Sequence, residues 1–254
     1  MILPKTILIT GASSGIGEAL ALYYAKSGVR LFLCGRNAGR LESVAAACRA
    51  KGADVETAVL DVTDETMLAE WILSVDEKKP LDLVIANAGI SGGGAGYENG
   101  EPVAQARSVF DVNVIGVLNT VQPILPRMVA RHFGQIALMS SLAGFRGWPG
   151  APSYSASKGA VRFYGEALRG AVAHTGVKIN VICPGFVRSR MTDQNDFPMP
   201  FFMEADKAAC IIAKGLARNR GRIAFPWQMH FMSWFISILP DALAQKILKR
   251  FPEK

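Results

Sequence analysis

Short apolar runs alternate with helical patterns along almost the whole of this 254-residue chain. The runs that read as strands lie at 6–10, 30–34, 55–60, 81–86, 135–139, 178–182 and 222–225. The helical patterns between them lie at 15–27, 41–51, 65–78, 104–131, 153–173 and 205–217. Alternation of this kind indicates crossover connections, and runs as apolar as LDLVIA suit strands covered on both faces. The pattern predicts a Rossmann-type, doubly wound α/β fold with a seven-stranded, mostly parallel sheet and helices on both faces.

Length and composition favour one domain over residues 1–254, with a core at 5–225 and a C-terminal helical extension at 226–254. A hydrophobic content of 50% with 19% charged residues is typical of a globular protein and excludes a disordered one. The cysteines show neither CxxC nor histidine-paired spacing, so we expect a reducing, cytoplasmic location and no metal. The first apolar run stops at Gly11, which is too early for a signal peptide.

A glycine-rich turn, TGASSGIG at 10–17, stands where the first expected strand meets the first expected helix. Gly11, Gly15 and Gly17 let the backbone turn tightly and approach a pyrophosphate at the N-terminus of the helix. An ordinary glycine-rich turn is the alternative, but the strand before it and the helix after it favour a dinucleotide site.

The end of the second expected strand bears on the choice between NAD and NADP. An NAD site usually places an acid there for the ribose hydroxyl. This chain has Gly35, Arg36 and Asn37 instead, and a guanidinium matches a phosphate with a planar fork of donors. The sequence therefore predicts NADP(H), although a solvated loop arginine gives the same pattern.

Tyr154 and Lys158 lie four residues apart, which places them on one face of a helix. A phenol with a pKa near 10 is a poor proton donor, and an ammonium beside it favours the phenolate. Taken alone, this spacing is common in helices and more often reflects a buried tyrosine and a solvated lysine.

Several motifs occur together in one order, and with them the chain resembles the short-chain dehydrogenase/reductase family over about residues 5–225. These motifs are TGASSGIG at 10–17, Asp61-Val62, Asn87-Ala88-Gly89, Asn113, Ser141, Tyr154 with Lys158, and Pro184-Gly185. Ser141 precedes Tyr154 by the interval usual in that family, whereas Ser140 does not.

The resemblance implies a catalytic group and a cofactor site. Tyr154 would be the general acid/base, Ser141 would hold the substrate oxygen, and Lys158 would lower the pKa of Tyr154 and bind the nicotinamide ribose. Asn113 would distort the long helix and hold a water. The implied cofactor-binding positions are Gly11, Ser13, Ser14, Gly15, Ile16, Gly17, Arg36, Asp61, Val62, Asn87, Ala88, Gly89, Tyr154, Lys158, Pro184, Gly185, Val187 and Ser189. Thr192 is the alternative to Ser189 as the hydroxyl for the carboxamide.

Three segments, at 91–100, 143–151 and 191–203, are expected around the substrate. The expected substrate-binding residues are Ser141, Tyr154, Trp148, Phe186, Phe201 and Phe202. The apolar side chains of 191–203 would form a lid over the substrate, and such a lid favours a hydrophobic or long-chain carbonyl. The same aromatics would also suit packing on the body or on a partner subunit.

The net charge of +7 is concentrated at the C-terminal end: residues 207–254 hold nine basic side chains against two acidic ones. The apolar run at 227–239 is too short to span a bilayer, and 242–251 reads as an amphipathic helix. Aromatic and basic residues together are the makings of an interfacial anchor, so peripheral contact with the cytoplasmic face of a membrane is one of two interpretations. The alternative is a helix pair that covers the pocket or forms a dimer seam. No nucleic-acid motif is present, so no nucleic-acid partner is expected.

The combined prediction is an NADP(H)-dependent oxidoreductase that interconverts a ketone or aldehyde and an alcohol. A 3-oxoacyl or 3-keto lipid and a hydroxysteroid or other bulky alcohol both remain open as substrates. The resemblance implies a homodimer or homotetramer built on the long helix and the Tyr154 helix. A non-catalytic NADP(H)-binding sensor or scaffold is the alternative function.

Overall fold

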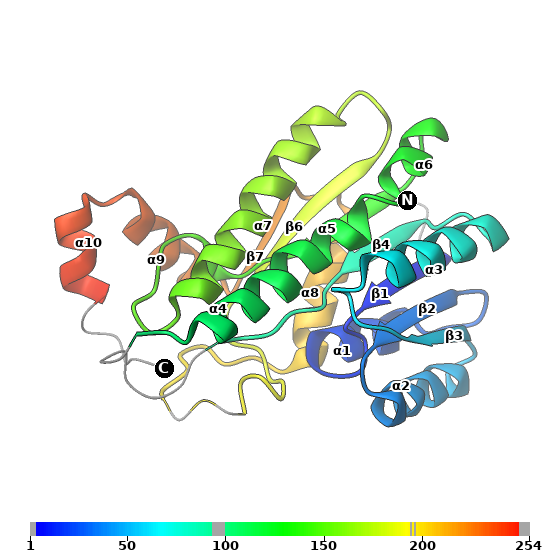
Figure 1. Cartoon of the computed structure of the whole chain (residues 1–254), viewed down its shortest axis with the longest axis horizontal. Coiled ribbons are helices and arrows are strands. Elements are labelled where there is room, and N and C mark those ends of the chain that lie inside the picture. The colour runs from blue at the N-terminus through cyan, green and yellow to red at the C-terminus, as the bar shows by residue number, and fades with distance from the viewer. Residues whose placement is uncertain (1–3, 93–99, 194, 196, 249–254) are drawn as a thin grey trace.

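The computed structural model describes residues 4–92, 100–193, 195 and 197–248, and they form one seven-stranded sheet flanked by helices (Figure 1). Every strand pair in it is parallel, and the order is β3-β2-β1-β4-β5-β6-β7. The strands are β1 (Thr6–Thr10), β2 (Arg30–Gly35), β3 (Asp54–Val59), β4 (Leu83–Ala86), β5 (Gln135–Met139), β6 (Lys178–Pro184) and β7 (Arg222–Phe225). This confirms the predicted fold class. The order reverses between β1 and β4, where such sheets open a crevice for a ligand.

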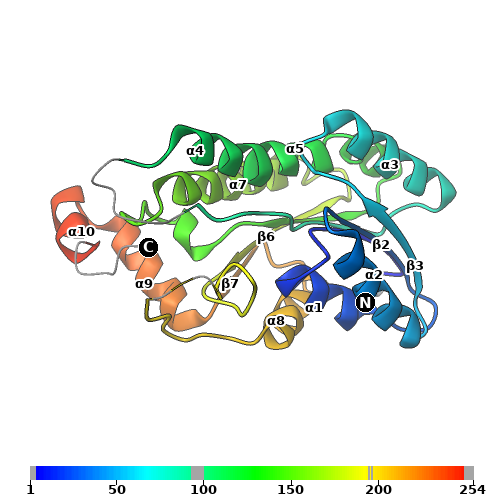
Figure 2. The same ribbon diagram turned by 60° about the horizontal axis from the view of Figure 1, so that its bottom comes forward.

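Helices cover both faces of the sheet (Figure 2). One face carries α1 (Gly15–Tyr24), α2 (Ala38–Ala50) and α8 (Ala205–Ala217); the other carries α3 (Glu65–Lys78), α4 (Val103–Phe110), α5 (Gly116–Val121) and α7 (Pro152–Ala171). Successive side chains of a strand point to opposite faces. Accordingly, Ile7 and Ile9 belong to the first core cluster and Leu8 to the second.

The helix expected over 104–131 is interrupted. After α4, residues Asp111–Ile115 form a π-helix, then α5 follows, then a turn, then α6 (Leu125–Ala130). Pro123 lies in the turn and Pro126 in the first turn of α6, and proline cannot donate the hydrogen bond that continues a helix. By length and composition alone, Val103–Ala130 could cross a membrane, but half of its most apolar stretch is buried in the fold. The apolar character of this stretch is therefore explained by its packing in the core of the fold.

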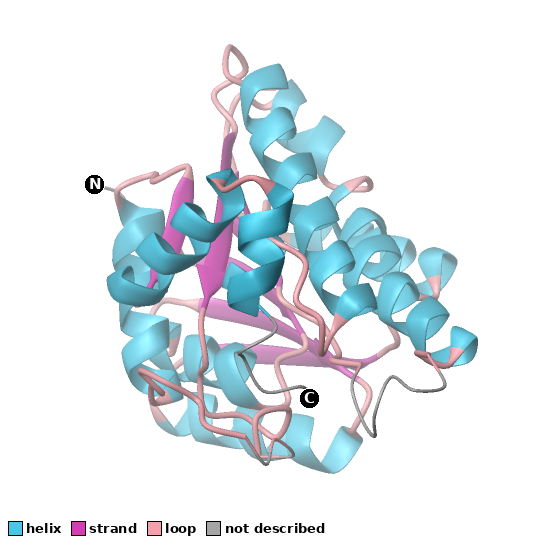
Figure 3. Ribbon diagram, turned by 90° about the vertical axis from the view of Figure 1, so that its left-hand side faces the viewer, coloured by secondary structure: helices cyan, strands magenta, loops and turns pink. Residues whose placement is uncertain are grey.

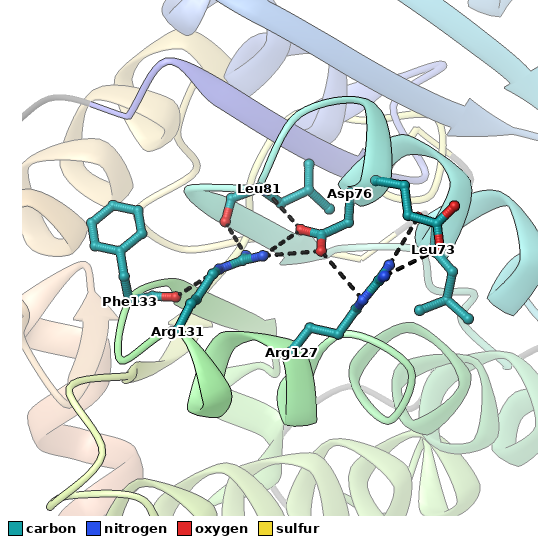
Figure 4. A network of polar contacts seen from close by, with 7 residues as sticks. Leu73, Asp76, Leu81, Arg127, Arg131 and Phe133 are labelled. Carbon is teal, nitrogen blue, oxygen red and sulfur yellow. Dashed lines mark hydrogen bonds and ion pairs between the residues drawn. The ribbon is translucent and has the colours of Figure 1, made fainter.

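A buried carboxylate ties α3 and α6 to the start of β4 (Figure 4). Asp76 accepts hydrogen bonds from Arg131 at 2.7 and 2.9 Å and from the backbone N–H of Leu81 at 2.9 Å. Arg131 also donates to the Leu81 carbonyl at 2.8 Å. Each charge is thus paired on several sides, which is the condition under which a buried ion pair is tolerated.

The C-terminal extension forms α9 (Trp227–Ile238) and α10 (Asp241–Leu248) at one end of the molecule (Figures 1 and 3). Residues 249–251 of the helix expected over 242–251 lie outside the described residues. Ile236, Ala244 and Leu248 form a small buried cluster against which Trp148 packs. An ion pair between Arg146 and Asp241 adds a second link to the body.

Candidate active site

A cavity of about 650 Å³ opens at the carboxyl edge of the sheet, beside the β1–α1 turn and the ends of β4, β5 and β6. Gly11 and Gly15 have φ angles of 64° and 58°, a left-handed conformation that glycine adopts without strain. Asn87 holds this turn by donating to the carbonyls of Thr10 at 2.9 Å and Gly11 at 3.1 Å. A Cβ on Gly17 would lie 2.3 Å from the Gly11 oxygen. The turn is therefore a closely packed backbone cradle at a helix N-terminus, which suits a phosphate group.

Two guanidinium groups border one end of the cavity. Arg36 follows β2, with its side chain 62% exposed, and forms an ion pair with Asp61 at 3.4 Å. Arg40 lies in the first turn of α2, where its backbone N–H donates to the Asn37 side chain at 2.9 Å. The sequence did not identify Arg40 as a site residue, because an arginine early in a helix resembles an ordinary exposed residue. The pair makes this end of the cavity suited to an anion.

Asp61 is held ionised at the same end. Burial raises its pKa, but hydrogen bonds from the backbone and side chain of Thr63 and the charge of Arg36 outweigh burial, so the pKa lies below its ordinary value. Asp61 thus presents a hydrogen-bond acceptor to the cavity at neutral pH.

Ser141, Tyr154 and Lys158 meet at the centre of the cavity. Ser141 lies two residues after β5, and its hydroxyl accepts from the N–H of Ala143 at 3.1 Å and hydrogen-bonds to the Tyr154 phenol. Tyr154 lies in the first turn of α7, and the ammonium of Lys158, one turn later, lies 5.7 Å from the centre of its ring. The i, i+4 spacing thus brings the pair together as predicted.

Burial shifts the pKa of both titratable groups. It raises the pKa of Tyr154, against the opposing effect of the Ser141 hydrogen bond. It lowers the pKa of Lys158 to about 8. The Lys158 ammonium donates to the Met139 carbonyl at 3.0 Å. The direction for Tyr154 differs from the sequence expectation of a lowered pKa, because desolvation of the phenolate dominates.

Asn113 lies behind the cavity wall, fully buried in the π-helix. Its side chain accepts from the N–H of Ile90 at 2.8 Å and donates to the Ile90 carbonyl at 2.9 Å and to Ser157 at 3.0 Å. A Cβ on Gly89 would lie 3.1 Å from Asn113 Oδ1 and 3.2 Å from Lys158 Nζ. Asn113 therefore joins the strand end, the distorted helix and α7 directly beside Lys158. The expected distortion of the helix is present, while the water-holding role stays a prediction.

Apolar side chains line the opposite end of the cavity. Trp148 and Phe186 contribute to it as expected, and α9 adds Met229, Met232 and Ser233, which the sequence reasoning had not assigned. The extension therefore covers the pocket, one of the two alternatives left open. The segment 91–100 was also expected here, but residues 93–99 of it lie outside the described residues.

Phe201 and Phe202, also expected at the substrate, do not line the cavity. Phe201 has a φ of 55° and is 54% exposed, and the ring of Phe202 lies under the Arg188 guanidinium at 5.3 Å. These two rings stay outside the cavity because a short parallel bridge between Val187 and Met203 turns Met203 inward instead.

The other expected positions gather as predicted. Of the implied cofactor-binding residues, all except Gly17 line the cavity, and Gly17 supports the turn from behind. Ser189 and Thr192 both line it, and the Thr192 hydroxyl accepts from the N–H of Ser189 at 2.9 Å. Either hydroxyl is therefore placed to meet a ligand.

A family model described as short chain dehydrogenase matches residues 5–198. The chain belongs to this family. An uncharacterized oxidoreductase of Myxococcus xanthus is 41% identical over 247 residues, which are 97% of each chain. An uncharacterized oxidoreductase of Mycobacterium tuberculosis is 35% identical over 227 residues, 88% of each.

Solved structures of the short chain dehydrogenase family share the fold. A short-chain dehydrogenase from Sphingobium yanoikuyae in complex with NADPH superposes with a TM-score of 0.81 at 25% identity, covering 98% of this chain and 96% of that one. An actinorhodin polyketide ketoreductase with NADPH gives a TM-score of 0.75 at 28% identity, covering 87% and 94%. The first of these likenesses includes the C-terminal extension.

Proposed function

We propose that this short chain dehydrogenase is an NADP(H)-dependent oxidoreductase that interconverts an apolar ketone or aldehyde and its alcohol. The observation that carries the proposal is the meeting of Ser141, Tyr154 and Lys158 in one cavity with a phosphate cradle and two guanidinium groups. Two related structures were solved with NADPH, which supports the cofactor.

The residues of the cavity fit NADP(H). The backbone turn at Gly11–Gly15 would hold the pyrophosphate, Arg36 and Arg40 the 2′-phosphate, and Tyr154 and Lys158 the nicotinamide ribose. When bound, the nicotinamide supplies or accepts the hydride. The protein supplies placement and protons.

Tyr154 and Ser141 would neutralise the charge that develops on the substrate oxygen during reduction. Tyr154 donates its proton to that oxygen, and Ser141 donates a hydrogen bond to it. Burial keeps the phenol in its neutral, proton-donating form. The low pKa of Lys158 places its proton exchange close to neutral pH, so the lysine is suited to pass a proton toward Tyr154.

The apolar end of the cavity favours a hydrophobic substrate. Trp148, Phe186, Met229 and Met232 supply that wall. A granaticin polyketide synthase putative ketoacyl reductase from Streptomyces violaceoruber is 36% identical over 190 residues, 74% of this chain, which supports a 3-oxoacyl or 3-keto substrate. A hydroxysteroid or other bulky alcohol is the alternative that the same wall allows.

The proposed enzyme is a cytoplasmic homodimer or homotetramer. Its cysteines are all free, as a reducing compartment requires. Exposed apolar side chains on α4 and α7, among them Val103 (66% exposed) and Phe163 (63%), support assembly through these helices. Analytical ultracentrifugation tests this, since a monomer at micromolar concentration would contradict it.

The activity test follows the loss of NADPH absorbance with a panel of ketones, from small aldehydes to 3-oxoacyl thioesters and ketosteroids. Tyr154→Phe should abolish turnover while NADPH binding, followed by its fluorescence, is retained. Unchanged cellular function with Tyr154→Phe would instead favour a sensor or scaffold.

The cofactor test compares NADPH with NADH. Charge-assisted hydrogen bonds contribute about 1.5–3 kcal/mol each, so Arg36→Ser or Arg40→Ser should weaken NADPH roughly tenfold to a hundredfold and leave NADH unaffected. Arg49→Ser is the matched control, because Arg49 lies on the same helix as Arg40 but is paired with Glu42. Faster turnover with NADH in the unmodified protein would overturn the NADP assignment.

A further inference from the structure

We propose that the outer face of α9 and α10 docks on an anionic lipid bilayer, and that the cavity draws its apolar substrate from that membrane. The second half rests on the proposed function, and the first half stands without it. The surface, called here the α9–α10 apolar face, consists of Trp227, Phe231, Trp234, Phe235, Ile238, Leu243 and Ile247.

The α9–α10 apolar face is built like an interfacial helix. Trp227, Phe231, Trp234 and Ile238 recur at the spacing of one helical stripe. They are 73%, 58%, 44% and 58% exposed, and Phe235 beside them is 45% exposed. The ring of Phe231 stacks on that of Phe235 at 6.4 Å. Single exposed apolar residues are ordinary, but a continuous aromatic stripe marks a contact surface.

The charges around this face decide between a membrane and a second copy of the chain. α9 holds no Asp, Glu, Lys or Arg, and the acid of α10, Asp241, is paired with Arg146. Lys246 is on α10, and in the sequence the six residues that follow α10, 249–254, add Lys249, Arg250 and Lys254 against Glu253. A two-fold contact between copies sets the same patch against itself, so these positive charges would oppose one another. An anionic bilayer would attract them instead.

The rest of the C-terminal basic excess lies elsewhere and plays no part in the proposal. Lys207 and Lys214 are on α8, Arg218 and Arg220 lie between α8 and β7, and Arg222 is paired with Glu166. The attraction therefore comes from the extension alone, and apolar insertion must supply most of the affinity.

The position of the cavity links docking to the reaction. Met229, Met232 and Ser233 line the cavity from the inner face of α9, and the α9–α10 apolar face is the other side of the same helix. A helix with its side chains is about 10–12 Å across, so a bilayer on the outer face would lie about that far from the cavity wall. An apolar substrate dissolved in the membrane would then reach the site by crossing one helix layer rather than bulk water.

The test is cosedimentation of the full chain with vesicles of phosphatidylcholine, with and without phosphatidylglycerol, together with the tryptophan emission maximum. We expect binding and a blue shift with the anionic vesicles and much less with the neutral ones. Trp227→Gln combined with Phe231→Ser should reduce binding about tenfold or more. Phe133→Ser, which removes an aromatic side chain that is 47% exposed on a loop remote from α9, should change nothing.

Turnover of a water-soluble ketone without vesicles separates the two proposals, because the double variant should keep it. Absence of vesicle binding by the unmodified protein would overturn the docking proposal while leaving the proposed function intact. Loss of oligomer mass in the double variant, with no vesicle binding, would assign the face to a second copy. Equal binding to neutral and anionic vesicles would refute the role given to charge.

Discussion

Asn113→Ala should destabilise this protein far more than a typical buried asparagine substitution. The Asn113 amide makes three hydrogen bonds, two to the backbone of Ile90 and one to Ser157, and is fully buried. A hydrogen bond contributes about 0.5–1.5 kcal/mol net, and an abandoned partner adds to the loss. We therefore expect the free energy of unfolding to fall by about 3 kcal/mol and the Tm to fall by roughly 5–15 °C.

The assay is urea unfolding followed by circular dichroism, with Asn119→Ala as the matched control. Asn119 is also buried, lies in the next helical segment, and donates one hydrogen bond to the Val62 carbonyl at 3.0 Å. Its loss should cost about 1 kcal/mol. If Asn113→Ala costs no more than Asn119→Ala, the joining role given to Asn113 is wrong. A kcat that is unchanged at saturating NADPH would separately contradict the catalytic role expected of Asn113.

Three further predictions follow from burial and close contact. Burial lowers the pKa of Lys158 from 10.5 to about 8. Between these two pH values the unfolded chain binds more protons than the folded one, so the free energy of unfolding rises with pH, by up to about 3 kcal/mol. Lys158→Met should remove that rise in urea unfolding between pH 8 and 10, and parallel curves for the two proteins would contradict it. Gly17→Ala should abolish NADPH binding in a fluorescence titration, because the added Cβ would lie 2.3 Å from the Gly11 carbonyl oxygen. Gly39→Ala is the control and should bind NADPH normally, because its added Cβ has its nearest neighbour at 3.8 Å. Asp76→Ala leaves Arg131 without its carboxylate and should cost about 3–5 kcal/mol in thermal or urea unfolding; a loss under 1 kcal/mol would show that water replaces the pair.

The parts of the fold that depend on local pattern were predictable. β1, β5 and β7 begin and end where their apolar runs do, and the glycine turn lies where its spacing placed it. The interruption between α5 and α6 also had a local signal in Pro123 and Pro126, which the long apolar periodicity of 104–131 concealed.

The remaining parts of the site depend on contacts that sequence spacing does not reveal. Met203 rather than Phe201 turns inward because the segment pairs with Val187, a partner 16 residues away. Arg40 reaches the cavity because α2 begins directly after β2, and Met232 does so because α9 packs against β7 and the short helix Leu142–Gly144. None of these side chains stands in a motif, so only the packed chain identifies them.

The strand order also fixes when the sheet can be completed during synthesis. β1 pairs with β2 within the first 35 residues, but its other neighbour, β4, begins at Leu83. A nascent chain that has emerged only through β3 therefore presents one side of β1, a strand that is fully buried in the finished fold, as an open edge. Such edges recruit other strands, so ribosome-bound intermediates shorter than about 90 residues should be the stage at which this protein most needs a chaperone.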